Sequence, residues 1–147
     1  MAYCTIEDLY DAMGKQSIID YAQNDSTEEA SVYEPRIDAV IENATAEIDG
    51  SLRSRYKTPL DPVPVFIKDI CIKIALYNLI SRKGYAKDSA EENYRKRYED
   101  VKDELKRIQK GEIDIGIATS ESTSRPAPTV LYRTKKRQFG DESMGGY

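Results

Sequence analysis

The side chains that could carry out chemistry in this sequence are its two cysteines, its many carboxylates and one lysine within an apolar stretch. The 147 residues contain 26 Asp and Glu and 22 Lys and Arg, but no His. The absence of His excludes a Ser-His-Asp triad, a Cys-His dyad and any metal site that uses His ligands. Cys4 and Cys71 lie far apart and belong to no CxxC motif, so they indicate buried free thiols rather than a zinc site or a disulfide framework.

The carboxylates and the lysine are more simply explained as surface residues. Asp100, Asp103 and Glu104 could form an acidic cluster, but a solvated helix face accounts for them. Lys73 could act as a nucleophile, although a lysine at such a position usually extends along its helix towards water. The sequence contains neither a phosphate-binding loop nor a DxDxDG calcium loop. We therefore expect no enzymatic activity, no cofactor and no metal ion.

Length and composition indicate one folded domain. Charged residues make up 33% of the chain, hydrophobic residues make up 39%, and the formal net charge is −4. An acidic balance argues against a dedicated nucleic-acid-binding protein, which usually carries a basic patch. No uncharged apolar run reaches the roughly 18 residues that a membrane span needs. The opening MAYCTIEDLY is not expected to be a signal peptide, because it lacks a basic region and Glu7 and Asp8 interrupt it.

Hydrophobic periodicity predicts an all-α bundle of three long helices and one or two short ones. Thr5 is a suitable N-cap for a first short helix that ends near Gly14, and a second short helix is predicted over 15–21. A capping-box pattern at 31–34 predicts the start of a long helix that continues to about Tyr56. That helix has one apolar stripe, which contains Ile37, Val40, Ile41, Ala44, Ile48 and Leu52.

The two remaining long helices differ in their surfaces. Residues 65–83, including Phe66, are apolar on nearly every side, which predicts the buried central helix of the bundle. Residues 88–109 form a highly charged helix with a narrow apolar seam, made of Ala90, Tyr94, Tyr98, Val101, Leu105 and Ile108. Gly50, inside the first long helix, is either a tolerated weak point or a place where another helix approaches closely.

The pattern changes after Gly111. We predict a helical domain over residues 1–111 and an extended C-terminal tail over residues 112–147. Strict alternation over 112–117 predicts one short strand, and a Ser/Thr/Pro-rich linker follows at 118–129. The end of the tail is either a disordered terminus or a segment that becomes ordered on a partner, and its apolar residues favour the second. The candidate partner-binding residues are Leu131, Tyr132, Arg133, Arg137, Phe139, Met144 and Tyr147.

Charge is unevenly distributed between the two ends of the chain. Residues 1–62 contain 13 Asp and Glu against 5 Lys and Arg, a net charge of −8. The tail contains a basic cluster, Arg133, Lys135, Lys136 and Arg137. Opposite charges of this kind could attract one another between subunits.

Several stretches, in order, resemble one phage family. The start fits M-x-Y-x-T-x-x-D-L, and a longer stretch fits A-x-x-E-I-D-G-x-L-x-x-R-Y-x-x-P-L from Ala44 to Leu60. Two later helical stretches also fit, through Ile70, Ile74, Ala75, Tyr77 and Leu79, and through Tyr98, Leu105, Ile108 and Gly111. The end is similar to a closing R-x-F…L-x-G-F pattern, with Met144 in place of Leu and Tyr147 in place of Phe. Together these motifs resemble the small neck proteins of Mu-like bacteriophages and prophages, which are adaptor or head-completion components.

The resemblance implies a non-enzymatic virion protein. It would be made in the cytoplasm of the bacterial host and placed in the neck of the virion as a head-tail connector subunit. Its implied partners are other copies of itself, in a closed ring of about twelve, the portal protein, and downstream neck and tail proteins. Genomic DNA would pass through the ring without specific binding. The alternative from another class is a small helical regulatory or protein-binding module, a dimer that uses the Tyr94–Ile108 seam as its contact.

Overall fold

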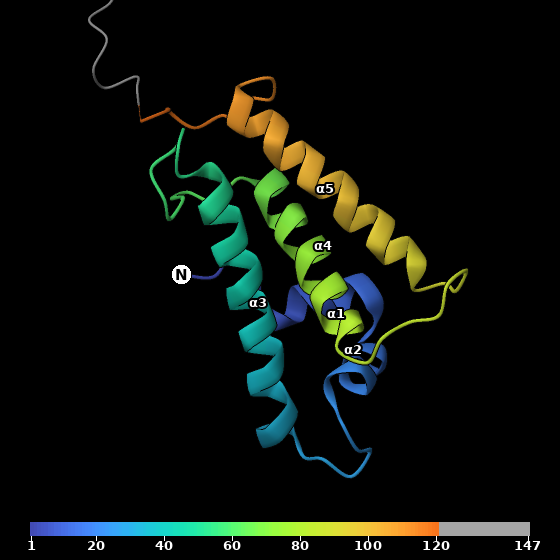
Figure 1. The fold of residues 1–147 in the computed structure, drawn as a ribbon. Helices are drawn as coiled ribbons and strands as arrows, with labels where there is room; N and C mark the ends of the chain where they lie inside the picture. The colour runs from blue at the N-terminus through green and yellow to red at the C-terminus, as the bar shows by residue number, and fades with distance from the viewer. Residues whose placement is uncertain (121–147) are drawn as a thin grey trace, which may run out of the picture.

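The computed structural model describes residues 1–120, and within them the fold is entirely helical. These residues form three long helices and two short ones. Figure 1 shows the long helices side by side, with the short helices packed behind the central one. The all-α prediction is confirmed. None of the helices between residues 1 and 120 is both long and apolar enough to cross a bilayer. The helices are α1 (Ile6–Met13), α2 (Lys15–Ala22), α3 (Ala30–Leu52), α4 (Val65–Ser81) and α5 (Glu92–Lys110).

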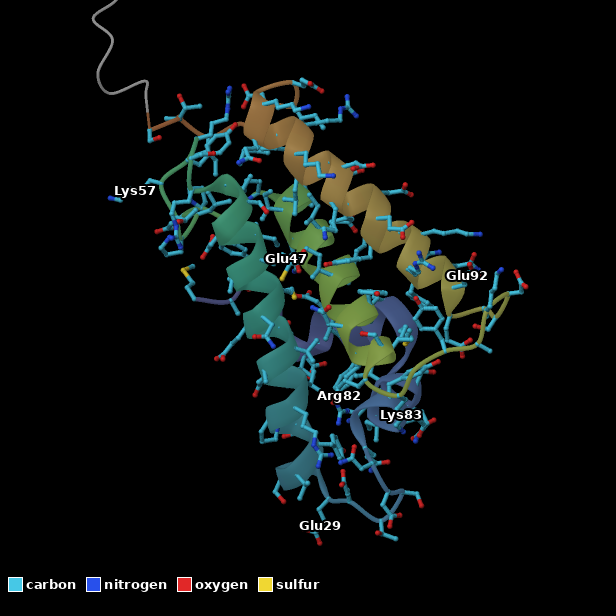
Figure 2. All side chains as sticks on the ribbon, viewed as in Figure 1. Glu29, Glu47, Lys57, Arg82, Lys83 and Glu92 are labelled. Carbon is cyan, nitrogen blue, oxygen red and sulfur yellow. The ribbon has the colours of Figure 1, made fainter. Side chains whose placement is uncertain are left out.

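The short helices begin and end where their capping residues predict. The Thr5 side chain accepts a hydrogen bond from the Asp8 backbone N–H, and the Asp8 carboxylate accepts one from the Thr5 N–H at 2.9 Å. Gly14, at φ +97°, separates α1 from α2. Arg82 and Lys83, at the end of α4, donate to backbone carbonyls at the end of α2 (Figure 2). These cations satisfy the open carbonyls of α2 and fix it against α4.

The beginning of α3 differs from the capping-box prediction. The helix begins at Ala30, and its N-cap is Glu29, whose carbonyl accepts from the N–H groups of Val32 and Tyr33. The predicted box at 31–34 is therefore wrong, because those residues already lie inside the helix. Arg36 holds the preceding loop by an ion pair with Glu28 at 2.5 Å, so a tertiary contact stabilises this end instead.

The apolar stripe of α3 is buried against α4, as predicted. The central position of α4 is confirmed as well, since it packs against all four other helices. Its buried side chains lie all round it: Ile67, Ile70, Cys71, Ile74, Ala75, Leu76, Leu79 and Ile80. The first turn is an exception, because Val65 is 85% exposed and Phe66 is 37% exposed.

The apolar seam of α5 faces the core of its own chain. Val101, Leu105 and Ile108 are buried. Tyr98 stacks on Tyr77 with ring centroids 4.2 Å apart, and its hydroxyl donates to Glu47 at 2.9 Å. The seam is therefore occupied, and the prediction that it forms the contact of a coiled-coil dimer is wrong. The helix begins at Glu92 rather than at 88, because residues 87–91 form turns and a bend.

Residues 112–117 do not form the predicted strand. No strand lies within residues 1–120 to pair with them, and an unpaired strand would leave its backbone groups unsatisfied. The segment instead turns, with the Gly116 N–H donating to the Asp114 carboxylate at 2.8 Å. Its alternating isoleucines have another cause: Ile115 is buried, and Ile113 and Ile117 pack against the helical core.

Gly50 is a weak point in α3 rather than a close contact, because a Cβ added there would meet no atom within 4 Å. Gly111 is the opposite case, with φ +83° and the Arg55 guanidinium in the place of a Cβ.

We expect Gly50→Ala to raise the free energy of unfolding by about 0.5–1 kcal/mol. The control Gly111→Ala should lower it by about 1 kcal/mol or more. Urea unfolding of the full chain measures both, and destabilisation by Gly50→Ala would show that α3 needs the glycine.

Candidate interaction surfaces

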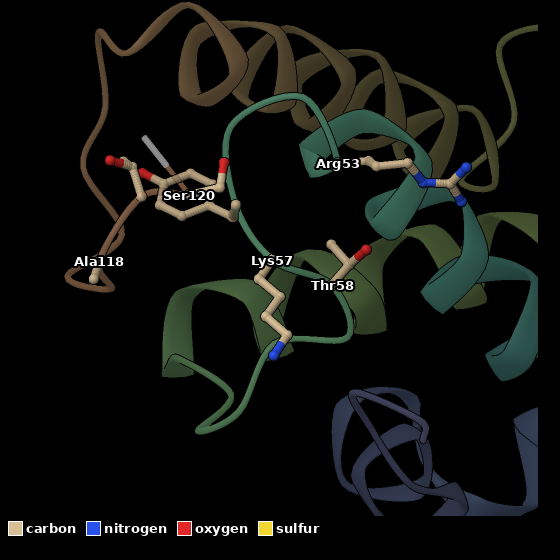
Figure 3. Close-up of a pocket in the computed structure, with 7 residues that line it drawn as sticks. Arg53, Lys57, Thr58, Ala118 and Ser120 are labelled. Atoms are coloured by element: carbon tan, nitrogen blue, oxygen red, sulfur yellow. The ribbon is translucent and has the colours of Figure 1, made fainter. Parts of the chain in front are cut away.

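The first candidate surface lies around Ser120, the last residue that the structure describes. The backbone N–H and the hydroxyl of Ser120 both donate to the Arg55 carbonyl at 2.9 Å, which fixes this segment to the loop after α3. A hollow of about 650 Å³ lies between that loop and the segment that ends at Ser120. Figure 3 shows the residues that line it. Its lining includes the cations Arg53 and Lys57 and no carboxylate. Ser120, the last described residue, is therefore held at a defined point, beside two positive charges.

A buried network supports this end of the bundle. The Tyr3 hydroxyl donates to the Asp49 carboxylate and accepts from the Leu60 backbone N–H at 2.8 Å. It thus joins the N-terminal segment, α3 and the following loop. Burial, together with the hydrogen bond to Asp49, raises the pKa of Tyr3 to about 12 from its ordinary value of 10.0. The hydroxyl stays protonated in the folded chain at a pH where it would ionise in the unfolded chain.

Replacing Tyr3 should therefore change both stability and its pH dependence. We expect Tyr3→Phe to lower the free energy of unfolding by about 1–3 kcal/mol at neutral pH, because Leu60 and Asp49 lose their partner. The raised pKa means that this contribution is complete below pH 10 and is lost as the pH rises towards about 12. In the Tyr3→Phe variant, the free energy of unfolding should fall less over that pH range. Chemical denaturation at a series of pH values measures it.

Tyr33→Phe is the matched control, since no hydrogen bond of the Tyr33 hydroxyl is seen within residues 1–120. If the stability of Tyr3→Phe falls with rising alkaline pH as steeply as that of the wild type, ionisation of the Tyr3 hydroxyl is not coupled to folding.

The second candidate surface is an acidic groove between α1 and α3. Ile6 and Ile41 contribute to its apolar floor, and Glu7, Asp38 and Glu42 line it with carboxylates. The hollow measures about 460 Å³. Within residues 1–120, no Lys or Arg forms an ion pair with any of these three carboxylates. An apolar floor with unneutralised negative charge suits a partner segment that carries both apolar and basic side chains.

The carboxylates near the acidic groove also affect the pKa of Tyr10, a neighbouring residue of α1. Burial is the main reason that the pKa of Tyr10 is raised, and nearby Glu34, Glu7 and Asp38 raise it further. These residues come from two helices, and only the fold brings them together.

Of the catalytic candidates weighed in the sequence, Asp100 and Asp103 are exposed, whereas Lys73 and Glu104 are partly buried. Lys73 forms an ion pair with Asp69 at 2.7 Å, one turn away on α4. Asp103 pairs with Lys106 at 3.2 Å, and Asp100 is exposed. Across residues 1–120, no three His, Cys, Asp or Glu side chains are grouped so that they could hold a metal ion. The candidate tail residues lie outside the described residues: Leu131, Tyr132, Arg133, Arg137, Phe139, Met144 and Tyr147.

The two cysteines form a contact that their spacing did not predict. Both are buried free thiols, as expected, but their sulfur atoms lie 3.2 Å apart. The Cys4 thiol donates to Cys71 Sγ, and Thr45 Oγ1 lies 3.7 Å from the same atom. The hydrogen bond from Cys4 lowers the pKa of Cys71, while donating that bond, together with burial, raises the pKa of Cys4.

Comparison with known proteins connects these features to a family. Residues 3–132 match the family described as Bacteriophage Mu, Gp36. The chain belongs to the bacteriophage Mu Gp36 family. The chain is also similar to the Mu-like prophage FluMu protein gp36 of Haemophilus influenzae, with 31% identity over 120 residues. That alignment covers 82% of this chain and 81% of the relative, and the resemblance to a Mu-like phage family is confirmed.

In this Gp36 family member, the motif from Ala44 to Leu60 builds the end of the bundle to which Ser120 is bound. Five of its residues are buried in the core: Ala44, Ile48, Leu52, Tyr56 and Leu60. Asp49 and Glu47 accept from tyrosine hydroxyls of other elements. The Arg55 carbonyl binds Ser120, and the Arg55 guanidinium occupies the space above Gly111. The motif residues thus contribute to the core and hold Ser120 in position.

Proposed function

We propose that this chain is a structural protein of the virion, a subunit of a ring-forming head-tail connector between portal and tail. Membership of a Mu-like phage family supports a phage role. Within residues 1–120 the buried apolar side chains, from Tyr3 to Ile115, form one core cluster. Such a core suits a structural scaffold. In this role the chain is not an enzyme and needs no cofactor.

The observation that carries the proposal is the anchoring of Ser120. Its backbone N–H and hydroxyl are held on the Arg55 carbonyl, so the sequence that follows starts from the same point in every copy of the subunit. That sequence contains the apolar and basic residues expected to bind a partner. In a closed ring, one face of a subunit meets a different face of its neighbour. Weak contacts repeated around the ring add up to a strong assembly.

The acidic groove is the receiving surface in this proposal. The tail brings Arg133 and Arg137, with Tyr132 and Phe139 beside them, and the groove offers carboxylates around an apolar floor. Arg133 lies thirteen positions after Ser120, so the chain can place it up to about 45 Å from Ser120. That reach exceeds the roughly 35 Å length of α3, which has 23 residues, and in this proposal it brings the tail to the groove of an adjacent copy.

Acidic residues of 1–62 outside the groove would suit the lining of a channel for DNA. Residues 1–62 have a net charge of −8, and carboxylates facing a channel repel phosphates. Because phosphate attraction drives non-specific binding, an acidic lining lets DNA slide through. This part of the proposal accounts for passage without specific binding.

The test of the virion role is the location of the protein in mature particles. Antibodies against the helical domain, detected by gold in electron micrographs of purified virions, should label the junction between head and tail. Absence of the protein from purified virions, or label on the capsid faces or the distal tail, would contradict the proposal.

A further inference from the structure

We propose that Cys4 and Cys71 form an intrachain disulfide when the protein meets a peroxide oxidant outside a reducing compartment. Their sulfur atoms lie 3.2 Å apart, and a disulfide requires about 2.05 Å. A shift of roughly half an ångström by each sulfur is therefore sufficient. The chain contains two cysteines in all, so no third thiol competes for either of them within one chain. The reaction is a property of this fold and does not depend on the connector role.

The surroundings of the pair allow both the movement and the entry of oxidant. Cys71 is fixed within α4, whereas Cys4 lies in the segment before α1, which belongs to no helix. Cys4 is also among the residues that line the acidic groove, although it is 3% exposed and Cys71 is fully buried. Hydrogen peroxide would reach Cys71 from that side when the segment before α1 moves.

The chemistry balances with peroxide as the two-electron oxidant. The Cys71 sulfur attacks one peroxide oxygen, so an S–O bond forms, the O–O bond breaks and water leaves with the thiol proton. The Cys4 sulfur then attacks the sulfenic sulfur of Cys71, the S–S bond forms and the hydroxyl leaves as water with the Cys4 proton. Two thiols are oxidised and one peroxide is reduced to two waters. The hydrogen bond from Cys4, which lowers the pKa of Cys71, favours Cys71 as the attacking sulfur.

The bond would lock one wall of the acidic groove. It would join the N-terminal segment covalently to α4 and close the loop from Cys4 to Cys71. Such a link restricts the unfolded chain and holds Cys4 and Thr5, which line the groove, in place. A protein made in a reducing cytoplasm and later exposed to an oxidising medium would gain stability at the time it leaves the cell.

The test uses the full chain, purified with reductant, freed of it and treated with hydrogen peroxide. The sample is then denatured with an alkylating reagent and its intact mass is measured. We expect a mass lower by two hydrogen atoms, no alkylation, and a peptide that joins Cys4 to Cys71. The melting temperature should rise by about 10 °C and return to its first value with dithiothreitol.

Cys4→Ala and Cys71→Ala are matched controls that should show no such rise after the same treatment. The mass of the wild-type chain decides the question without them, even if a variant folds poorly. Two alkylated thiols after treatment, sulfinic acid on one cysteine, or disulfides that join separate chains would each overturn the proposal.

Discussion

Truncation after Ser120 should abolish incorporation of the protein into virions while its helical content and melting temperature stay nearly unchanged. The core side chains of the described residues lie between Tyr3 and Ile115, and Ser120 keeps its bonds to the Arg55 carbonyl. Truncation removes every candidate partner-binding residue of the tail. Because ring contacts are repeated around the assembly, losing one contact per subunit should lower the yield of infectious particles by on the order of a hundredfold or more.

The measurement is complementation of a phage that lacks the gene, with particle titre and virion-bound protein as readouts. Circular dichroism of the purified truncated chain gives the stability control. The double variant Tyr132→Ala and Phe139→Ala keeps the length of the tail and should reproduce most of the defect. A truncated chain that supports a full titre would show that the tail is not needed for assembly.

Reversing charge in the acidic groove should produce a comparable loss. Asp38 and Glu42 are exposed on α3, and within residues 1–120 neither forms an ion pair, so Asp38→Lys with Glu42→Lys should fold normally. The two lysines would repel Arg133 and Arg137 of a neighbouring tail. We expect an assembly defect on the order of a hundredfold.

Two companion variants make the charge reversal decisive. Asp61→Lys with Asp100→Lys changes net charge by the same amount at exposed positions outside the groove and should leave titre unchanged. Adding Arg133→Glu and Arg137→Glu to the groove variant should restore particles, because attraction returns with opposite signs. Failure of this rescue, with both chains folded, would mean that the tail binds elsewhere.

The helices were predictable because their signals are local. Thr5 and Asp8 form a capping box by themselves, and the stripe of α3 follows from spacings of three and four. Prediction failed where a distant group decides the local structure. Arg36 and Glu28 hold the start of α3 in place of the expected cap, and residues 112–117 pack their isoleucines on the core instead of pairing as a strand.

The candidate sites were predictable only in outline. Charge counts indicated an acidic N-terminal half, but not that Glu7 of α1 would lie beside Asp38 and Glu42 of α3. The contact between Cys4 and Cys71 and the bonds of Tyr3 to Asp49 and Leu60 join residues far apart in the chain. Periodicity carries no signal for such pairs, because it reports which face is buried and not which residues meet.

The most direct test of the account replaces Phe139 with a photo-cross-linking amino acid and assembles that variant together with isotopically labelled wild-type chains. The account expects light to join position 139 of one copy to the acidic groove of a labelled copy, near Ile41 and Glu42. Two results would contradict the claim that the tail binds a neighbouring subunit. One is that position 139 cross-links only within its own copy, and the other is that assembled particles contain no cross-link to the groove.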